Sequence, residues 1–402
     1  MSRRPVDGLK APVGGSRSRA GSFDLVVVGG GISGASALWH ASAIGMRALL
    51  LERHHLAAGP SGSSTANVRR HYSTPALAHV AAESFGFYSD FHRLTGFDAG
   101  FDRVGVLLAV AAHEVEAFAA SVSRLRARGA RVDLLGPMEI AARIPGARLD
   151  DVAAAVYEPD GGYADATAAV NGFAEGAVRA GASIRTRTRV SAVRVDAGRV
   201  TGVELADGRH VRSPRVLLAA GPWTNDVLAT VGSSVPTFAE RNVVAVLHLP
   251  GRAKTVLPSV FSDRSRRYYA RPDGESVILL GGRTSRTAPV DGLDRFDRAV
   301  PLDESAEIVG RAGERLPQLG TADIRPGFAG LYDVSPDGLP IVGPVPGVKG
   351  LFVWTGTSGH GFRLAPGLAA LLVERMGGRR AQLLDHFRMD REYTPTGELT
   401  PR

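Results

Sequence analysis

The sequence predicts an α/β protein whose discontinuous first domain carries an inserted α+β domain with an antiparallel or mixed sheet. Three observations predict this organisation. A β-α-β pattern opens the chain, a block that starts at Phe91 breaks the alternation, and buried-strand patterns that suit the first domain return at 216–220 and 351–354. A chain of 402 residues is long enough to form two cores.

Composition indicates a globular protein without a membrane span. Hydrophobic residues make up 44% of the chain and charged residues 22%. No apolar run reaches the roughly 18 residues that a spanning helix needs. The net charge of +8 comes almost entirely from scattered arginines without a basic motif, so we expect no nucleic-acid partner. The absence of cysteine excludes disulfides and cysteine-ligated metals, and we expect no metal site.

The N-terminal segment predicts a disordered tail. Residues 1–21 are rich in Arg, Ser, Gly and Pro and lack apolar periodicity. Arg3 and Arg4 are not followed by an apolar segment before Phe23, so they do not indicate an export signal. We therefore expect a cytoplasmic protein.

The first domain begins with a β-α-β unit. Phe23–Val28 is a short apolar run, as in a buried parallel strand, and Ala35–Ile44 is small and apolar, as in a closely packed helix. Arg47–Leu51 gives the second strand. Later parts of this domain are a helix, a strand-rich segment with a turn, two buried strands and a last helix: Ala166–Ala180, Ser183–Val203 with Asp207-Gly208, Val216–Ala220, Leu351–Trp354 and Pro366–Met376.

The inserted domain is predicted from the segments between these. A predicted helix at Ala76–Leu94 leads into the first part of this domain. Within that part the patterns indicate helices at Glu114–Arg128 and Pro137–Ala142, and strands at Arg103–Ala111 and Val132–Leu135. In its second part they indicate strands at Arg241–Leu249, Tyr268–Arg271 and Ser276–Gly281, and a helix at Glu304–Leu316.

A glycine-rich turn follows the first strand and predicts a dinucleotide site. Gly29, Gly31 and Gly34 have the GxGxxG spacing, which allows a tight turn, close approach to a pyrophosphate and close helix packing. Ile32 and Ser33 open the helix whose N-terminal N–H groups face the phosphates. Glu52 ends the second strand, where a carboxylate binds ribose hydroxyls and repels a 2′-phosphate, so FAD or NAD is favoured over NADP.

Four segments in order along the chain resemble the D-amino-acid oxidase superfamily of flavoproteins, in particular its sarcosine oxidase and glycine oxidase branch. They are GGGISG at 29–34, AAGPSGSSTANVRRHYSTP at 57–75, VLLAAGPWTN at 216–225, and the stretch from LYDVSPDG to FRLAPG at 331–367. The resemblance implies FAD rather than NAD, because the GTSGHGF segment has no role in an NAD-dependent dehydrogenase.

The resemblance also implies the division of the chain. A Rossmann-like FAD-binding domain would comprise 22–90, 150–233 and 326–385, and a substrate domain would comprise 91–149 and 234–325. The two tails would be 1–21 and 386–402.

The residues that the family pattern places around FAD lie in the same segments. The turn at 356–361 would approach the flavin ring, and the helix after it would direct its N-terminus at the pyrimidine side, where a reduced flavin carries negative charge. The implied FAD-binding residues are Gly29, Gly31, Ile32, Ser33, Gly34, Glu52, Arg53, Ser63, Ser64, Thr65, Val190, Ala220, Gly221, Trp223, Gly359, His360, Gly361, Phe362 and Arg363.

The resemblance implies oxidation of a secondary or primary amine of an N-methyl or D-amino acid. A hydride would pass from the carbon that bears nitrogen to flavin N5, giving an imine. Arg69 and Arg363 match carboxylate-binding positions, for which a guanidinium is well suited. Tyr332 and either Tyr268 or Tyr269 match pocket tyrosines. His360 would be catalytic or structural, and we leave both roles open.

Two departures from the family pattern concern the flavin. Gly330 stands where the family has a cysteine joined to the flavin, so we expect noncovalent FAD. A link through a histidine stays open, with His54, His55 and His71 as candidates.

A further departure concerns the reaction with oxygen. Leu279 or Leu280 stands where the pattern has an oxygen-activating lysine, which argues against rapid use of oxygen, and Arg283 is a candidate replacement. The sequence leaves open the electron acceptor and the oligomeric state.

Two other functions fit the same fold. One is oxidation of a 2-hydroxy acid, for which His71 or His360 would be the base that takes the hydroxyl proton. The other is a flavin-binding subunit that needs a partner. The substrate itself is expected to be a small amino-acid-like molecule with a carboxylate.

Overall fold

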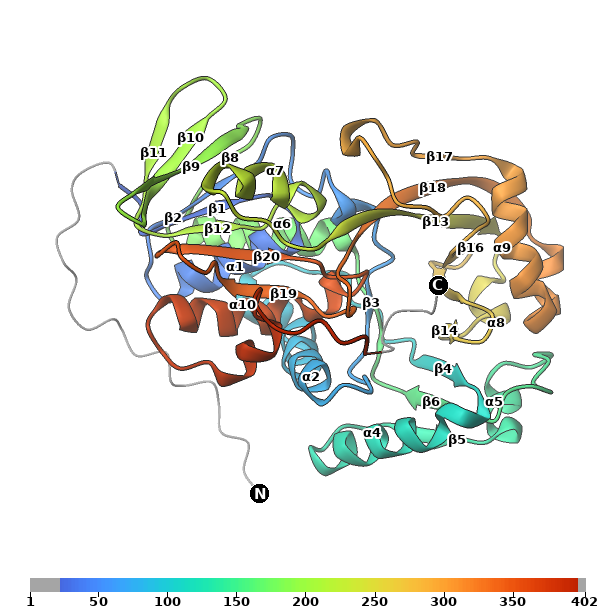
Figure 1. Ribbon diagram of the computed structural model, residues 1–402. Helices are drawn as coiled ribbons and strands as arrows, with labels where there is room; N and C mark the ends of the chain where they lie inside the picture. The colour runs from blue at the N-terminus through green and yellow to red at the C-terminus, as the bar shows by residue number, and fades with distance from the viewer. Residues whose placement is uncertain (1–21, 397–402) are drawn as a thin grey trace.

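The computed structural model describes residues 22–396 and contains two large sheets that lie side by side (Figure 1). One has six strands and the other nine. The predicted disordered tail, residues 1–21, and positions 397–402 of the predicted C-terminal tail lie outside the described residues. Residues 391 and 396 of that tail bond to Asp337, which holds the segment against the first domain.

The six-stranded sheet is parallel except at one edge, where β19 runs antiparallel to β20. Its central strands are short, apolar and fully buried, as expected for a sheet that is covered on both faces. In spatial order the strands are β19 (Ile341–Pro344), β20 (Leu351–Thr355), β12 (Val216–Leu218), β1 (Leu25–Val28), β2 (Ala48–Leu51) and β8 (Ser183–Arg185).

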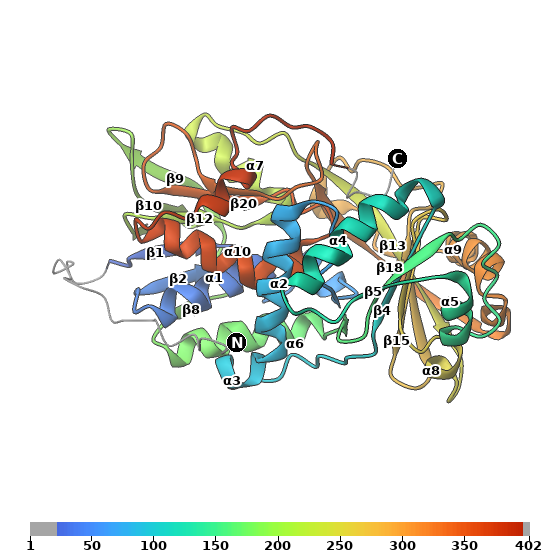
Figure 2. The same ribbon diagram turned by 90° about the horizontal axis from the view of Figure 1, so that it is seen from below.

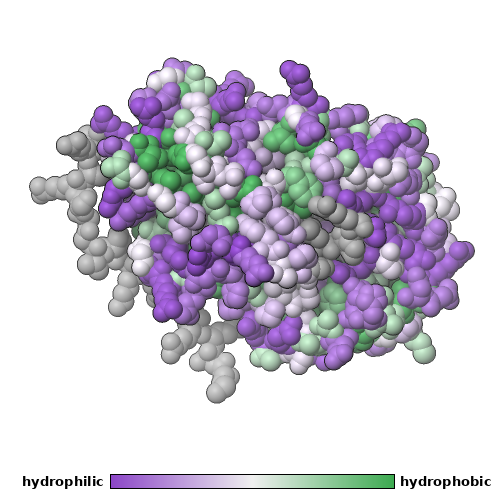
Figure 3. Space-filling model, viewed as in Figure 1, coloured by the Kyte–Doolittle hydropathy of each residue, from purple (hydrophilic) through white to green (hydrophobic). Residues whose placement is uncertain are grey.

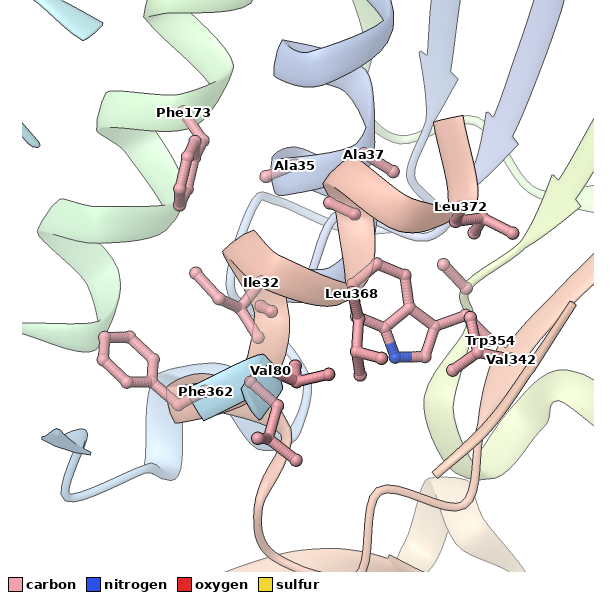
Figure 4. Close-up of a cluster of buried hydrophobic side chains, with 14 of the residues drawn as sticks. Ile32, Ala35, Ala37, Val80, Phe173, Val342, Trp354, Phe362, Leu368 and Leu372 are labelled. Carbon is pink, nitrogen blue, oxygen red and sulfur yellow. The ribbon is translucent and has the colours of Figure 1, made fainter. Parts of the chain in front are cut away.

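A layer of helices covers one face of this sheet, and Figure 2 shows α1, α10 and α2 lying side by side there. In Figure 4, Ile32 and Ala35 of α1 and Leu368 of α10 point into one cluster beside Trp354 of β20. Small residues along α1 let the neighbouring helices approach closely. The helices are α1 (Ile32–Ala43), α2 (Pro75–Ser89), α3 (Phe91–Thr95), α6 (Ala166–Arg179) and α10 (Gly361–Met376).

A three-stranded antiparallel sheet and a short helix cover the opposite face. Val193 and Val203 of the small sheet pack on Val26 and Leu49 of the large one. The elements are β9 (Val190–Asp196), β10 (Arg199–Leu205), β11 (His210–Arg212) and α7 (Thr224–Leu228). The predicted turn at Asp207-Gly208 joins β10 to β11, and Gly208 adopts a φ of +82° there.

The nine-stranded sheet is mixed, because β14 and β4 are parallel and the other pairs are antiparallel. This agrees with the predicted antiparallel or mixed sheet. In spatial order the strands are β17 (Ala299–Val300), β18 (Asp323–Val334), β13 (Phe238–His248), β16 (Val277–Gly282), β15 (Tyr268–Asp273), β14 (Val260–Asp263), β4 (Val106–Val110), β6 (Ala154–Glu158) and β5 (Asp133–Leu135).

Helices pack on both faces of the nine-stranded sheet. Three of them share a core with its outer face, namely α5 (Pro137–Arg143), α8 (Ala253–Val256) and α9 (Leu302–Arg315). The fourth, α4 (Val115–Ala127), packs on β4 and β6 from the other side. The strands β3 (Asn67–Val68) and β7 (Gly162–Tyr163) pair antiparallel in a separate two-stranded ribbon. The described 3₁₀ turns are η1 (Pro60–Ser63), η2 (Ala112–Glu114), η3 (Gly221–Trp223), η4 (Ala229–Val231), η5 (Leu293–Arg295), η6 (Pro317–Thr321) and η7 (Gln382–Phe387).

The strand β6 pairs with β4 and β5, so it belongs to the nine-stranded sheet although the sequence analysis placed residues 150–233 in the first domain. Similarly, β18 begins at Asp323, before the predicted boundary at 325 and 326, and continues into the first domain. The division of the chain between two domains stays a prediction.

Polar residues cover most of the face seen in Figure 3, with apolar residues in smaller areas.

Two predicted helices differ from the structure. The predicted helix Ala76–Leu94 is divided at Asp90 into α2 and α3. The predicted helix Pro366–Met376 begins five residues earlier, at Gly361, so that Pro366 lies inside it.

Side chains of α2 make this internal proline tolerable. Proline has no N–H to bond to the carbonyl four residues back, which is that of Phe362. The Tyr88 hydroxyl donates to this carbonyl at 2.7 Å, and the next N–H, of Gly367, donates to Ser84 Oγ at 2.9 Å. The first turn of α10 is therefore held by a neighbouring helix.

We predict that Tyr88→Phe lowers the free energy of unfolding by about 1–2 kcal/mol, because the buried Phe362 carbonyl loses its donor. The ring stacked on Phe362 stays in place. Urea denaturation of the FAD-free protein measures the change. The control is Tyr157→Phe, whose hydroxyl has no hydrogen-bond partner among residues 22–396, and equal effects of the two changes would contradict the prediction.

Candidate functional site

A cavity of about 630 Å³ lies between the two sheets, which is within the range of small-molecule sites. Its walls come from the loops that follow β1, β2, β12 and β20, and from β13 and β18 of the second sheet. Open α/β sheets bind ligands outside the carboxyl ends of their strands. The cavity has this position.

The glycine turn at the cavity leaves no room for side chains. A Cβ at Gly34 would lie 2.0 Å from the Gly29 carbonyl oxygen, so α1 packs directly on the turn. Gly29 has a φ of +113°, and a Cβ there would lie 2.4 Å from the Ala219 carbonyl oxygen. The N–H of Ile32 donates to Ser61 Oγ at 3.0 Å. The N-terminus of α1 thus faces the cavity and is joined to the loop at η1.

Glu52 is fixed at the end of β2 by two backbone groups. Its carboxylate accepts the N–H of Gly30 at 2.7 Å and the N–H of His54 at 2.7 Å. Because each oxygen has a second lone pair, the carboxylate can still bind a ligand in the cavity that it lines. Arg53 follows and lies over the ring of Trp223, 4.4 Å from its centroid.

Most of the predicted FAD-binding residues line this one cavity although they are far apart in the sequence. Gly34 and His360 are the exceptions, since Gly34 lies under the turn and His360 lies behind the wall. Those that line it are Gly29, Gly31, Ile32, Ser33, Glu52, Arg53, Ser63, Ser64, Thr65, Val190, Ala220, Gly221, Trp223, Gly359, Gly361, Phe362 and Arg363.

Two tyrosines form the wall at the end of the cavity near α10. A Cβ at Gly359 would lie 2.6 Å from the Tyr332 ring, and one at Gly281 would lie 2.2 Å from the Tyr269 ring, so both rings need a glycine beside them. Burial and the hydrogen-bonded hydroxyl of Tyr269 raise the pKa of Tyr332 well above its usual value. Tyr268 instead packs in the core of the second sheet.

Arg363 lines the same end of the cavity. Within residues 22–396, its guanidinium has no hydrogen-bond or ion-pair partner, and its charge acts on Tyr332. An unpaired guanidinium in a cavity wall is suited to bind an anion.

Arg69 does not line the cavity. Its guanidinium donates to the His71 carbonyl and lies over the Tyr72 ring, 4.5 Å from the centroid. The Tyr72 hydroxyl is 3.0 Å from Nδ1 of His360, the residue before α10. Tyr72, which the sequence analysis did not single out, therefore connects Arg69 to His360 behind the cavity wall. The roles predicted for both residues remain predictions.

A buried cluster of charged side chains, Glu158, Arg70 and His71, lies behind Arg69 and was not predicted from the sequence. The fully buried carboxylate of Glu158 accepts bonds from Arg70 Nε at 2.9 Å and the His71 N–H at 2.8 Å, and also contacts His71 Nδ1. Burial opposes ionisation of Glu158, but the bond to His71 and the charge of Arg70 lower its pKa to about 2. Burial and the charge of Arg69 lower the pKa of His71 to about 4. The cluster fastens the segment 69–72 to β6.

The three histidines considered for a flavin link have different surroundings. His54 lines the cavity beside Glu52, and His55 is exposed. His71 is buried against Glu158 and does not line the cavity.

No lysine lines the cavity among the described residues. Leu280 is in the core of the second sheet, and Leu279 is buried on the other face of the same strand. Arg283, the candidate replacement, forms an ion pair with Glu240 at 2.8 Å. This pair partly neutralises the charge.

Further residues that line the cavity were not singled out in the sequence. Asp333 is buried in the wall, where burial raises its pKa while Thr355 and the N–H of Gly356 donate to it. It follows Tyr332 in the LYDVSPDG stretch, which was the only signal for it in the sequence. The second domain adds Asn242, Leu293, Asp294 and Arg298. In residues 22–396 there is no cluster of metal-ligating side chains, and no helix is apolar and long enough to cross a membrane.

Residues 24–375 match the protein family described as FAD dependent oxidoreductase. The chain belongs to the FAD-dependent oxidoreductase family. This confirms the family, the fold class and the FAD cofactor that were predicted from the sequence.

Two curated relatives and one solved structure illustrate the similarity. 4-Methylaminobutanoate oxidase (formaldehyde-forming) of Paenarthrobacter nicotinovorans is 31% identical over 362 residues, which are 87% of this chain and 43% of that protein. Glycine oxidase of Pseudomonas aeruginosa is 35% identical over 207 residues, 51% of each chain. This chain thus spans about half the length of these relatives. L-Proline dehydrogenase from P. horikoshii shares the fold, with a TM-score of 0.82, 21% identity and coverage of 90% of this chain and 96% of that one.

The cavity of this FAD-dependent oxidoreductase fits its cofactor. The turn at Gly29 and Gly34 offers backbone where a pyrophosphate needs close approach, and Glu52 is held where a ribose would be bound. At the other end, the N-terminus of α10 at Gly361 would face a flavin ring.

We predict that Glu52→Ala weakens FAD binding by about 10- to 100-fold, because the turn loses its anchor and the ribose loses an acceptor. Titration of the FAD-free protein with FAD, followed by flavin fluorescence, measures this. Glu116→Ala, at an exposed position on α4, serves as the control and should bind FAD normally. Unchanged affinity in Glu52→Ala would show that this carboxylate does not hold FAD.

Proposed function

We propose that this chain oxidises the secondary or primary amine of a small amino-acid-like substrate to an imine, using FAD. The observation that carries the proposal is the unpaired guanidinium of Arg363 at the tyrosine-lined end of the cavity. The names of the two curated relatives, 4-methylaminobutanoate oxidase and glycine oxidase, support it, since both describe substrates that combine an amine with a carboxylate.

The residues at this end would hold and prepare the substrate. Arg363 would bind the carboxylate with two N–H groups and so fix the carbon that bears nitrogen. A cationic guanidinium in a partly apolar pocket disfavours an ammonium beside it, so the bound amine would be neutral and able to release a hydride. FAD, when bound, accepts that hydride. Tyr332 and Tyr269 would close the pocket and exclude water.

Arg69 is proposed as a second ligand of the carboxylate, which requires its guanidinium to leave the His71 carbonyl. For His360 we propose a positioning role, because its Nδ1 is engaged by Tyr72. FAD is proposed to bind without a covalent link. Gly330 carries no side chain, His54 lies beside Glu52, where a ribose would be bound, and His55 and His71 do not line the cavity. A cytoplasmic location stays a prediction from the sequence.

The geometry favours amine oxidation over the oxidation of a 2-hydroxy acid. A hydroxyl proton needs a base within hydrogen-bond reach. His71 and His360 were the candidates, but neither lines the cavity, and each has a ring nitrogen engaged by another side chain.

Anaerobic mixing of the FAD-loaded protein with candidate substrates tests the proposal. N-methyl amino acids, glycine, D-amino acids and 2-hydroxy acids are added in turn while the visible flavin absorption is followed. We expect bleaching with at least one amine and a matching imine hydrolysis product. Bleaching by 2-hydroxy acids alone would overturn the proposal, and no bleaching by any of them would favour a flavin-binding subunit that needs a partner.

We predict that Arg363→Met lowers kcat/KM for the best carboxylate substrate by about 100-fold, because a charge-assisted bidentate contact is lost. Amide analogues of the same substrate, which lack the negative charge, should lose much less. Steady-state kinetics with an artificial electron acceptor measures both, and the flavin spectrum checks that FAD remains bound. Arg286→Met, which removes a surface ion pair with Asp303, is the control. Equal losses for acid and amide would place the carboxylate elsewhere.

A further inference from the structure

A segment of the second domain crosses the FAD cavity. Residues 291–298, which we call the strap, lie between β16 and β17 and include the turn η5. Both ends of the strap are attached to the second sheet. Just before it, the Val290 N–H donates to the Ala239 carbonyl at 2.9 Å, and at its end the Arg298 carbonyl accepts the Ala329 N–H at 3.0 Å.

The middle of the strap is fastened to the first domain by one carboxylate. Asp294 Oδ1 accepts a bond from Arg53 Nη2 at 2.6 Å and another from Trp223 Nε1 at 2.8 Å. Arg53 also lies over the Trp223 ring, so the three side chains form a compact contact between segments that are distant in the sequence.

This contact lies directly over the cavity. Leu293, Asp294 and Arg298 of the strap line it, and so do Arg53 and Trp223. Since Arg53 follows Glu52, the middle of the strap at Asp294 lies at the half of the cavity in which Glu52 would bind a ribose. The tyrosines and Arg363 belong to the other half.

The strap is built to open at small energetic cost. None of its eight residues is buried, and the Asp294 side chain is 63% exposed. Phe296, near the end of the strap, is half-buried against the core of the second sheet, so the part that can move is the middle, around Asp294. Exposed ion pairs contribute little stability, and segments with few buried apolar contacts open without unfolding the core. The ends at Ala239 and Ala329, in contrast, lie on buried strand residues.

We propose that the strap is the gate for FAD, with Asp294 as its latch: the cofactor enters and leaves on the adenosine side only when Asp294 releases Arg53 and Trp223. The latch then controls the exchange of the cofactor. The inference goes beyond the proposed oxidation and does not depend on which amine is oxidised.

The first test removes the latch. In Asp294→Ala, FAD should dissociate about 10-fold faster and also associate faster, because the gate is open more often. Flavin fluorescence on dilution and on reconstitution measures the two rates. Asp303→Ala is the matched control, since it removes an exposed carboxylate of the same domain that pairs with Arg286 away from the cavity. Faster dissociation with unchanged or slower association would mean that Asp294 merely binds FAD, and would overturn the gate.

The second test closes the gate permanently. The chain contains no cysteine, so Arg53→Cys and Asp294→Cys can be combined and joined by a short bis-maleimide. The same double variant is compared before and after linking, which cancels the effect of the substitutions. Linking the FAD-free form should slow FAD uptake at least about 100-fold, and linking the loaded form should trap FAD. Each single-cysteine variant treated with the reagent is a control. Uptake at the unlinked rate after complete linking would overturn the proposal.

Discussion

The site depends on the contact between α1 and the turn that precedes it. With Gly34 packed directly on the Gly29 carbonyl, the axis of α1 is fixed relative to β1, and its N-terminus opens on the cavity. The same turn receives Glu52 through the Gly30 N–H, which couples β2 to the turn. A side chain at Gly34 would push the helix away, and with it the α10 and α6 layer that packs on α1.

The parts of the fold that depend on local pattern were predictable. Buried parallel strands such as β1 and β12 are recognisable as short apolar runs. The turn at Gly208 is recognisable because its backbone conformation favours glycine. The first turn of α10 was not predictable, because Pro366 is tolerated only through hydroxyls on α2. Strands β6 and β18 were missed for a similar reason. Their partners lie far away in the sequence, and pairing rather than local alternation defines them.

The same distinction holds for the site. Residues within the glycine-rich turn, such as Gly29 and Gly34, could be located because close backbone approach demands glycine there. The part of the cavity wall that the second domain contributes could not be predicted from the sequence. Asn242 and Asp294 reach the cavity through strand pairing and a loop crossing, for which a single sequence holds no signal. Tyr72 and Glu158 likewise acquire their meaning from partners that only the folded chain brings near.

Along β13, side chains that line the cavity alternate with side chains that pack in the core. Asn242 and Val244 line the cavity, whereas Val243 and Ala245, which alternate with them, belong to the core of the second sheet. The cofactor cradle comes mainly from the other domain. Substitutions at Asn242 and Val244 can therefore reshape the cavity while Val243 and Ala245 keep the hydrophobic core of the second sheet intact. Because cavity-lining and core residues alternate along this strand, a few substitutions could change the substrate specificity without changing the fold.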